Sequence, residues 1–209
     1  AVGIVQAAFG ADWPGDVAAM FARVNAEAVT LLRQRLASDS ARVVQTSSMG
    51  RLFDAVAFLL GLCDRNHTEA AAPIAVQALA DSIGPTDPLA WDIAKTDVGL
   101  LLDTRPTIRA IIDGVVAGEP RATLARGFHE ALGAMLTDAA RRVCGEAGVG
   151  QVVLSGGCFL NGLLRDILRV GLDRAGLSRY THNDLSPGDA CVSLGQAVIA
   201  AQTLRAGAH

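Results

Sequence analysis

Gln151-Val-Val-Leu-Ser-Gly-Gly157 runs from a short apolar segment directly into a pair of glycines. A valine- and leucine-rich run of this length that ends at a glycine turn is typical of a buried strand. Residues 161–175 then carry leucine and isoleucine along one side of a helix, residues 179–182 suggest a second strand, and residues 189–204 predict a closing helix. These elements form a βαβα unit, whose crossover helix makes the two strands parallel.

The part of the chain before this unit is mostly helical. Apolar residues at helical spacing predict helices over residues 14–36, 49–63, 73–82, 106–117 and 123–146. Between them, glycines and prolines predict loops and short strands around residues 91–93 and 99–102. We therefore expect an α/β fold that is mostly helical with a small sheet. Residues 1–209 form one domain, with a helical segment over about 1–147 and a βαβα segment over about 150–206.

The composition argues against several classes of protein. The 209 residues are 51% apolar with a formal net charge of −3, so the chain can bury a core and wholesale disorder is excluded. No apolar run reaches the ~18 residues that a membrane span needs. Lys95 is the only lysine and the arginines are scattered, which argues against a nucleic-acid track. We therefore expect no nucleic-acid partner and no membrane partner.

The cysteines and histidines show no ligand spacing. The four cysteines have no CxxC pattern and no accompanying pair of histidines. This favours small buried thiols over zinc or disulfides, and together with the lack of a charged-then-apolar leader it predicts a cytoplasmic protein. His129 follows Phe128 and is interpreted as structural. The GxSxG and P-loop motifs are both absent from the sequence.

The first candidate site is Ser155-Gly156-Gly157, between a predicted strand and a predicted helix. A glycine pair lets backbone N–H groups approach an anion without obstruction by side chains, and phosphate is the natural guest. The simpler interpretation is a tight turn with no ligand. Asn161, a few residues later, could contact a ligand, but capping of the next helix explains it equally well.

Two carboxylates are further candidates. Asp54 lies in an apolar helix that begins after three hydroxyl residues, 46–48, which suit its N-cap. A carboxylate in such a helix needs a partner, which could be a ribose hydroxyl or simply Arg51 one turn earlier. Asp189 follows a Pro-Gly turn at a predicted helix start. It could bind a metal ion, because hard cations prefer carboxylate oxygen, but its local sequence favours an N-cap.

Taken together, these segments resemble the carbamoyltransferase part of the HypF hydrogenase-maturation family. That part is related to the tRNA threonylcarbamoyl-transferase family and to the wider ASKHA (actin, sugar kinase, Hsp70) superfamily. The resemblance extends from about Leu31 to the end, in the family's order and spacing. The matching segments are Thr46-Ser-Ser-Met-Gly-Arg-Leu-Phe-Asp-Ala-Val56, Leu59-Leu-Gly-Leu-Cys63, Asp103 with Arg105-Pro106, Phe128-His129, Val153-Leu-Ser-Gly-Gly157 with Asn161 and Leu164, and Pro187-Gly-Asp189 with Ser193-Leu-Gly-Gln-Ala197.

The resemblance implies roles for individual residues. Ser155, Gly156 and Gly157 match the loop near the nucleotide phosphates, and Asn161 matches a nucleotide-contacting asparagine. Asp54 and Glu69 match carboxylates that contact the ribose and the adenosine. Asp189 matches a ligand of the divalent metal.

The resemblance also implies a reaction. The expected chemistry activates carbamoyl phosphate with ATP to carbamoyl-adenylate and transfers the carbamoyl group to the C-terminal thiol of a HypE-like acceptor. That group becomes the cyanide ligand of the [NiFe] centre. No catalytic side chain is assigned to this chain.

The sequence also departs from the family pattern. The metal-binding histidine pair belongs to a preceding lobe and has no equivalent here, so we expect ATP and a metal to be held fully only with a companion lobe. The family's Glu-Gly-Gln reads Glu69-Ala70-Ala71, and its Asp-Gly-Gly reads Asp189-Ala190-Cys191. An added methyl group at Ala70 could obstruct a nucleotide. Two alternatives therefore stay open: a non-catalytic interaction module of the same fold, and carbamoylation of another acceptor such as a hydroxyl.

Overall fold

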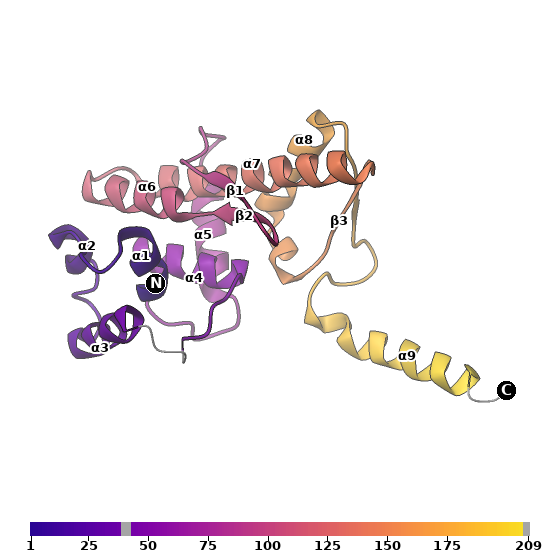
Figure 1. Ribbon diagram of the computed structural model, residues 1–209, viewed down its shortest axis with the longest axis horizontal. Coiled ribbons are helices and arrows are strands. Elements are labelled where there is room, and N and C mark those ends of the chain that lie inside the picture. Colours follow the sequence, from indigo (N-terminus) through magenta and orange to yellow (C-terminus); the bar gives the residue numbers. More distant parts are fainter. Residues whose placement is uncertain (39–42, 207–209) are drawn as a thin grey trace.

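The computed structural model describes residues 1–38 and 43–206. The helices and strands follow the chain as shown in Figure 1. The α-helices are α1 (Val2–Phe9), α2 (Gly15–Ala19), α3 (Ala26–Ala37), α4 (Met49–Leu59), α5 (Ala71–Asp81), α6 (Arg105–Val116), α7 (Arg121–Ala147), α8 (Gly162–Arg174) and α9 (Val192–Ala206). The strands are β1 (Asp92–Thr96), β2 (Gly99–Asp103), β3 (Gln151–Leu154) and β4 (Ser178–Thr181), and the 3₁₀ helices are η1 (Gly157–Leu160) and η2 (Asp189–Cys191).

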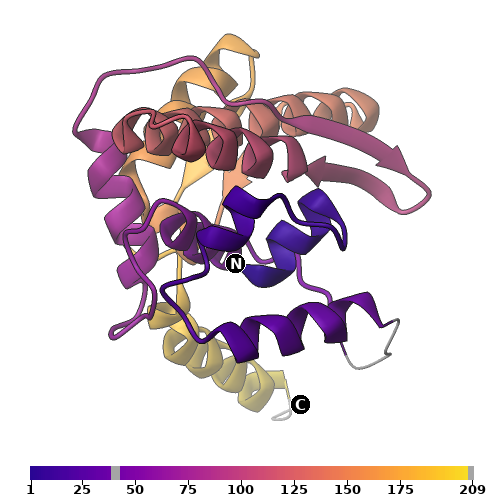
Figure 2. The same cartoon turned by 90° about the vertical axis from the view of Figure 1, so that its left-hand side faces the viewer.

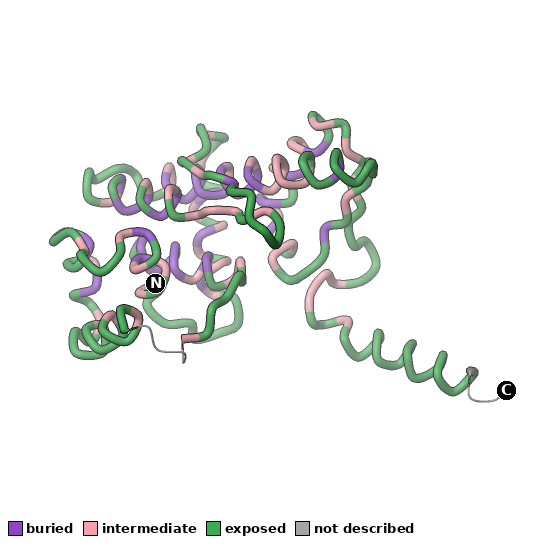
Figure 3. Tube along the Cα trace, in the orientation of Figure 1, coloured by how far each residue is buried: buried purple, intermediate pink, exposed green. Residues whose placement is uncertain are grey.

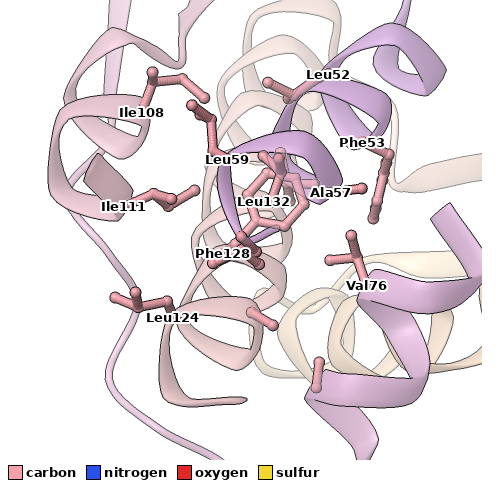
Figure 4. Close-up of a cluster of buried hydrophobic side chains, with 14 of the residues drawn as sticks. Leu52, Phe53, Ala57, Leu59, Val76, Ile108, Ile111, Leu124, Phe128 and Leu132 are labelled. Carbon is pink, nitrogen blue, oxygen red and sulfur yellow. The ribbon is translucent and has the colours of Figure 1, made fainter. Parts of the chain in front are cut away.

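The core lies between α4, α5, α6 and α7. Its large side chains come from all four helices and point into one cluster, which Figure 4 shows. At its centre Phe53 of α4 meets Phe128 of α7 edge to face, with ring centroids 5.1 Å apart. Both rings are almost fully buried. Burying a phenylalanine contributes about 2–3 kcal/mol, so this pair is a main contribution to the packing of α4 on α7.

The other N-terminal helices cover this core from one side. In Figures 1 and 2, α1 lies under α6, and α3 lies under α1 on the outer surface. Val5 and Ala8 of α1 are buried, whereas α3 has no buried residue. The outer layer is therefore held mainly through α1.

Two separate two-stranded sheets complete the fold. β1 and β2 form an antiparallel hairpin in which Ile93 faces Leu102. β3 and β4 pair in parallel, with Leu154 opposite Thr181, and α8 connects them. The mostly helical α/β class and the parallel pair predicted from the sequence are thus confirmed, with two small sheets in place of one.

The N-terminal region differs from the sequence prediction. The predicted helix over 14–36 is two helices, because α2 ends at Ala19 and α3 starts only after Asn25, whose side chain accepts a hydrogen bond from the N–H of Ala28 (2.9 Å). Between them Phe21 turns inward, and its ring lies 5.0 Å from that of Trp13 and 4.9 Å from that of Phe58. α1 was not predicted at all.

α9 stands apart from the rest of the chain. Figure 1 shows it extending away from the other helices, and every residue from Val192 to Arg205 is exposed (Figure 3). Its exposed residues include Ile199 at 67% and Leu204 at 76%. In the described part of the chain, no face of this helix is covered by another element. Among the described residues, no helix has both the length and the apolar character to cross a membrane.

α7 and α8 cross at very short range through two glycines. A Cβ placed at Gly133 of α7 would overlap Cγ2 of Ile167, and a Cβ at Gly171 of α8 would overlap Oγ1 of Thr137. Because a well-packed core does not absorb an added methyl group, these glycines set the distance between the two helices.

We expect Gly133→Ala to lower the free energy of unfolding by about 1–3 kcal/mol, because the new methyl group forces α7 and α8 apart. Gly145→Ala in the same helix is the matched control. Its Cβ would meet nothing within 4 Å, so the better helix propensity of alanine should raise stability by up to about 1 kcal/mol. Urea unfolding followed by circular dichroism measures both changes. Equal effects of the two substitutions would contradict the assigned contact.

Candidate functional site

Two predicted motifs that lie far apart in the sequence meet in space. The loop after β3, which we call the diglycine corner (Ser155, Gly156 and Gly157), lies against the loop before η2. The N–H of Gly156 donates to the carbonyl of Pro187 (2.9 Å), and a Cβ at Gly188 would lie 3.4 Å from Cα of Gly157. The carboxyl end of a parallel strand pair is where α/β folds commonly bind ligands.

The diglycine corner has free space in front of it. Gly156 has a φ of +107°, which side-chain-bearing residues rarely adopt. A Cβ built at Gly156 or at Gly157 would meet no atom within 4 Å. The first N–H groups of η1 have no acceptor within that helix. The corner therefore has room for an anionic group and the residues fit a phosphate, and binding of a nucleotide phosphate there stays a prediction.

His182 belongs to this site although the sequence analysis did not assign it. Its Nε2 lies 3.0 Å from Oγ of Ser155. Since Leu154 pairs with Thr181, the residue after each strand emerges at the same edge of the sheet. The predicted parallel pair was the signal that could have placed His182 beside Ser155.

Both the oxygen and the nitrogen of the Asn161 side-chain amide form hydrogen bonds within the chain. Its Oδ1 accepts from the N–H of Leu164 (2.9 Å), which confirms the predicted cap of α8, and its Nδ2 lies 3.1 Å from Nε2 of His129. Asn161 is only 9% exposed. Its predicted role as a nucleotide contact stays a prediction, and a direct contact would have to use the remaining N–H or the second lone pair of the amide oxygen.

His129 is buried and neutral, in agreement with its structural interpretation. Its Nδ1 lies 2.8 Å from the carbonyl of Ala125, which can only accept, so Nδ1 carries the proton and Nε2 accepts from Asn161. Burial lowers the pKa of this imidazole. The ring of Phe53 lies 5.4 Å from that of His129, edge to face. His129 thereby connects α4, which carries Asp54, to the start of α8.

Asp54 has two partners within the chain. Its Oδ2 forms an ion pair with Nη1 of Arg51 (3.0 Å), as one interpretation of the sequence expected, and its Oδ1 accepts from Nδ2 of Asn66 (3.1 Å). Oδ1 of Asn66 in turn accepts from the N–H of Ala72 at the start of α5 (3.0 Å). Asn66, which the sequence analysis missed, therefore joins the middle of α4 to the start of α5. A ribose contact by Asp54 stays a prediction.

Glu69 is exposed on the loop that leads into α5, and next to it Ala70 adopts a left-handed conformation with φ +58°. Among the described residues, Ala70 is the one non-glycine residue with positive φ. A Cβ in this region costs about 1–2 kcal/mol. The backbone therefore explains why glycine suits this position, independently of any nucleotide contact.

Asp189 is the one residue of this chain that the sequence predicted as a metal ligand. Asp189 is exposed, and the residue that begins η2 as its N-cap is Gly188, without a side-chain hydrogen bond, so the capping role favoured by the local sequence is wrong. Within residues 1–38 and 43–206, no group of three His, Cys, Asp or Glu side chains could hold a metal ion. The residues present do not fit a complete metal site.

The cysteines are all free. Only Cys144 is buried, whereas the other three are partly exposed, which corrects the expectation of four buried thiols. Burial raises the pKa of Cys158, the residue after Gly157. The thiol beside the diglycine corner therefore stays protonated near neutral pH and is a poor nucleophile.

We expect Ala70→Gly to raise the free energy of unfolding by about 1 kcal/mol, because glycine relieves the left-handed strain. The matched control is Ala71→Gly, one residue further along at the first position of α5, where glycine should lower stability by about 0.5–1 kcal/mol. Urea denaturation measures both. A loss of stability in Ala70→Gly would show that the left-handed backbone is not strained.

The neutral His129 makes stability depend on pH. As the pH falls below the ordinary histidine pKa of about 6.5, the unfolded chain takes up a proton that the folded chain refuses, so stability falls by up to about 1.4 kcal/mol per pH unit. The loss continues until the pH reaches the lowered folded pKa. Asp103 and Asp138, whose pKa values are lowered by arginine partners, contribute only in more acidic solution.

Urea unfolding of the wild type and of His129→Gln at pH 7.5, 6.5 and 5.5 checks this effect. Glutamine can still accept from Asn161 but does not titrate, so its stability should change little over the range. The same slope in both proteins would contradict the assignment to His129.

Comparison with known proteins places this geometry in one family. Residues 1–196 match the family described as "Carbamoyltransferase, Kae1-like Domain, second subdomain". The chain is 36% identical over 168 residues to "Carbamoyltransferase HypF homolog" of Cupriavidus necator, and 34% identical over 175 residues to "Carbamoyltransferase HypF" of Rhodobacter capsulatus. These matches cover 76% and 83% of this chain but only 41% and 22% of the relatives.

A solved structure shows the same similarity. The full-length HypF crystal structure in the phosphate- and nucleotide-bound form superposes with a TM-score of 0.79 at 27% identity, covering 90% of this chain and 25% of that one. The fold and the sequence agree on one assignment over most of the chain: it belongs to the HypF carbamoyltransferase family and corresponds to the second subdomain of its Kae1-like domain.

Proposed function

We propose that this chain is the nucleotide-binding lobe of a HypF-like carbamoyltransferase. The observation that carries the proposal is the open diglycine corner at the carboxyl edge of the β3–β4 pair, where a Cβ at Gly156 or Gly157 would meet no atom within 4 Å. A glycine loop of this kind receives phosphate groups because no side chain blocks the backbone. A related HypF has been solved in a phosphate- and nucleotide-bound form, which supports a nucleotide phosphate as the guest.

The remaining nucleotide contacts come from α4 and the loop before α5. Asp54 and Glu69 would bind the ribose and the adenosine through their carboxylates. Asp54 is held in position by Arg51 and Asn66, so its oxygens are already oriented. The packing of Phe53 on His129, and the bond of His129 to Asn161, keep this helix in a fixed position relative to the diglycine corner.

The proposed reaction uses carbamoyl phosphate and ATP to form carbamoyl-adenylate. The carbamoyl group then passes to the terminal cysteine thiol of a HypE-like acceptor, for the cyanide ligand of a [NiFe] hydrogenase. This chain would bind and orient the nucleotide. Asp189 alone does not make a metal site, and it would serve as one metal ligand among others from a companion lobe.

A companion lobe is supported by the surfaces that this chain leaves exposed. Val153 of β3 and its register partner Tyr180 of β4 are 69% and 53% exposed. Parallel sheets are normally covered on both faces, so the face with this pair needs another layer. The exposed apolar residues of α9 likewise need a further layer that covers them. We therefore propose that the lobe closes its active site, and becomes an enzyme, only with such a companion.

The second candidate function is a non-catalytic interaction module of the same fold. The observation that favours it is Ala70, whose methyl group stands where the family has glycine and whose backbone is left-handed. If that methyl group prevents nucleotide binding, the exposed α9 surface would still bind a partner. The two functions differ in one measurable property, which is binding of ATP.

We expect ATP to bind the wild-type chain weakly, and more tightly when the companion lobe is added, by isothermal titration calorimetry. Gly157→Val should reduce this affinity at least tenfold, because its side chain would occupy the open space at the corner. Gly157 has no positive φ and a Cβ there meets nothing within 4 Å, so the substitution should not disturb the fold.

Gly150→Val is the matched control. It lies at the opposite end of β3, also with nothing within 4 Å of its Cβ, and should leave the affinity unchanged. Absence of ATP binding by the wild type, alone and with the companion lobe, would favour the interaction module. Equal affinities of Gly157→Val and wild type would overturn the assignment of the corner.

A further inference from the structure

The diglycine corner carries an exposed side-chain pair for which the packing of the fold gives no reason. Oγ of Ser155 and Nε2 of His182 lie 3.0 Å apart, directly after β3 and β4. Both residues are exposed, so their hydrogen bond contributes little to a core. The strands are already joined by their own ladder from Gln151–Ser178 to Leu154–Thr181.

The glycines of the corner leave few donors for a ligand. The N–H of Gly156 is already used by the carbonyl of Pro187. A bound phosphate carries negative charge, and hydrogen bonds to a charged acceptor are about twice as strong as those between neutral groups. His182 is the residue at this edge whose ring can add a side-chain N–H donor beside the hydroxyl of Ser155.

A nucleophilic role for Ser155 is the main competing interpretation. A serine activated by histidine needs a third group that orients the imidazole through its other nitrogen. In the described part of the chain, Nδ1 of His182 has no hydrogen-bond partner. The pair therefore lacks the arrangement of a nucleophile and its base, and both side chains are free to turn toward a ligand.

We propose that Ser155 and His182 together bind a phosphate group of the ligand at the diglycine corner, with Ser155 donating its hydroxyl and His182 a ring N–H. This inference rests on the proposed function and adds side-chain donors to it. Phosphate at this place could come from ATP or from carbamoyl phosphate, and the experiment separates the two sources.

The test follows the imidazole resonances of His182 by NMR of the ¹⁵N-labelled chain. They are assigned by their loss in His182→Gln. ATP, adenosine and carbamoyl phosphate are titrated separately. We expect the His182 signals to move with a phosphate-bearing ligand and to stay fixed with adenosine. The ligand that moves them identifies the source of the phosphate.

Calorimetry gives the matching affinities. His182→Ala should weaken ATP binding about tenfold, since one donor to a charged phosphate is lost, and should leave adenosine binding unchanged. His182→Gln keeps a side-chain N–H donor in a different position, so its ATP affinity should fall between those of the wild type and His182→Ala. Lys95→Gln is the control for net charge, because Lys95 is exposed on β1 and pairs with Glu146 (3.6 Å), and it should bind ATP like the wild type.

The outcomes distinguish this inference from the proposed function. ATP binding with unmoved His182 signals and an unchanged affinity in His182→Ala would overturn the role of the pair and leave the nucleotide lobe intact. Equal losses for ATP and adenosine would indicate a merely structural effect and would also overturn it. If neither ATP nor carbamoyl phosphate binds the wild type, alone or with the companion lobe, both proposals fail.

Discussion

The buried hydrogen bond between Asn161 and His129 joins the βαβα unit to the helical layer, and the candidate site depends on it. The amide oxygen of Asn161 accepts from the first turn of α8, and its nitrogen donates to the ring of His129. That ring in turn is hydrogen-bonded to the carbonyl of Ala125 on α7. A buried polar group is costly unless it is paired, so each residue confines the other to one geometry. The diglycine corner leads through η1 to Asn161, so this bond fixes the end of the segment that carries the corner.

α7 holds the Asn161–His129 hydrogen bond in a fixed position. Its Phe128 meets Phe53 of α4, and the adjacent His129 meets Phe53 as well, so the two halves of the candidate site are fastened to the same turn of one long helix. Further along, Gly133 lets α8 approach to direct contact. Side chains of α4, α7 and α8 thus form a continuous packed path from Asp54 to the corner. A ligand that contacted both ends would meet groups that are already in place, which lowers the entropic cost of binding.

The same structure leaves other surfaces without neighbours. The parallel pair of β3 and β4 is covered by α8 on one face, while Val153 and Tyr180 stay exposed on the other, and α9 is exposed along its whole described length. A packed interior on one side and apolar groups in water on the other are typical of a unit that is completed by a further layer. The single carboxylate of Asp189 is incomplete in a similar way, because a metal ion would need several ligands and this residue offers one.

The sequence by itself determined the local structure. Helical spacing located α4 to α8, and the glycine turn after Gln151–Leu154 predicted the parallel pair, because these signals depend only on neighbouring residues. It missed α1, and it missed the break near Phe21, whose inward position follows from contacts with Trp13 and Phe58. The tertiary structure alone decided which distant side chains meet. Asn161 lies 32 residues from His129, and His182 lies 27 from Ser155, and no periodic pattern connects such pairs. They come together because the packing of α8 on α7 and the register of β3 with β4 set the distances in space.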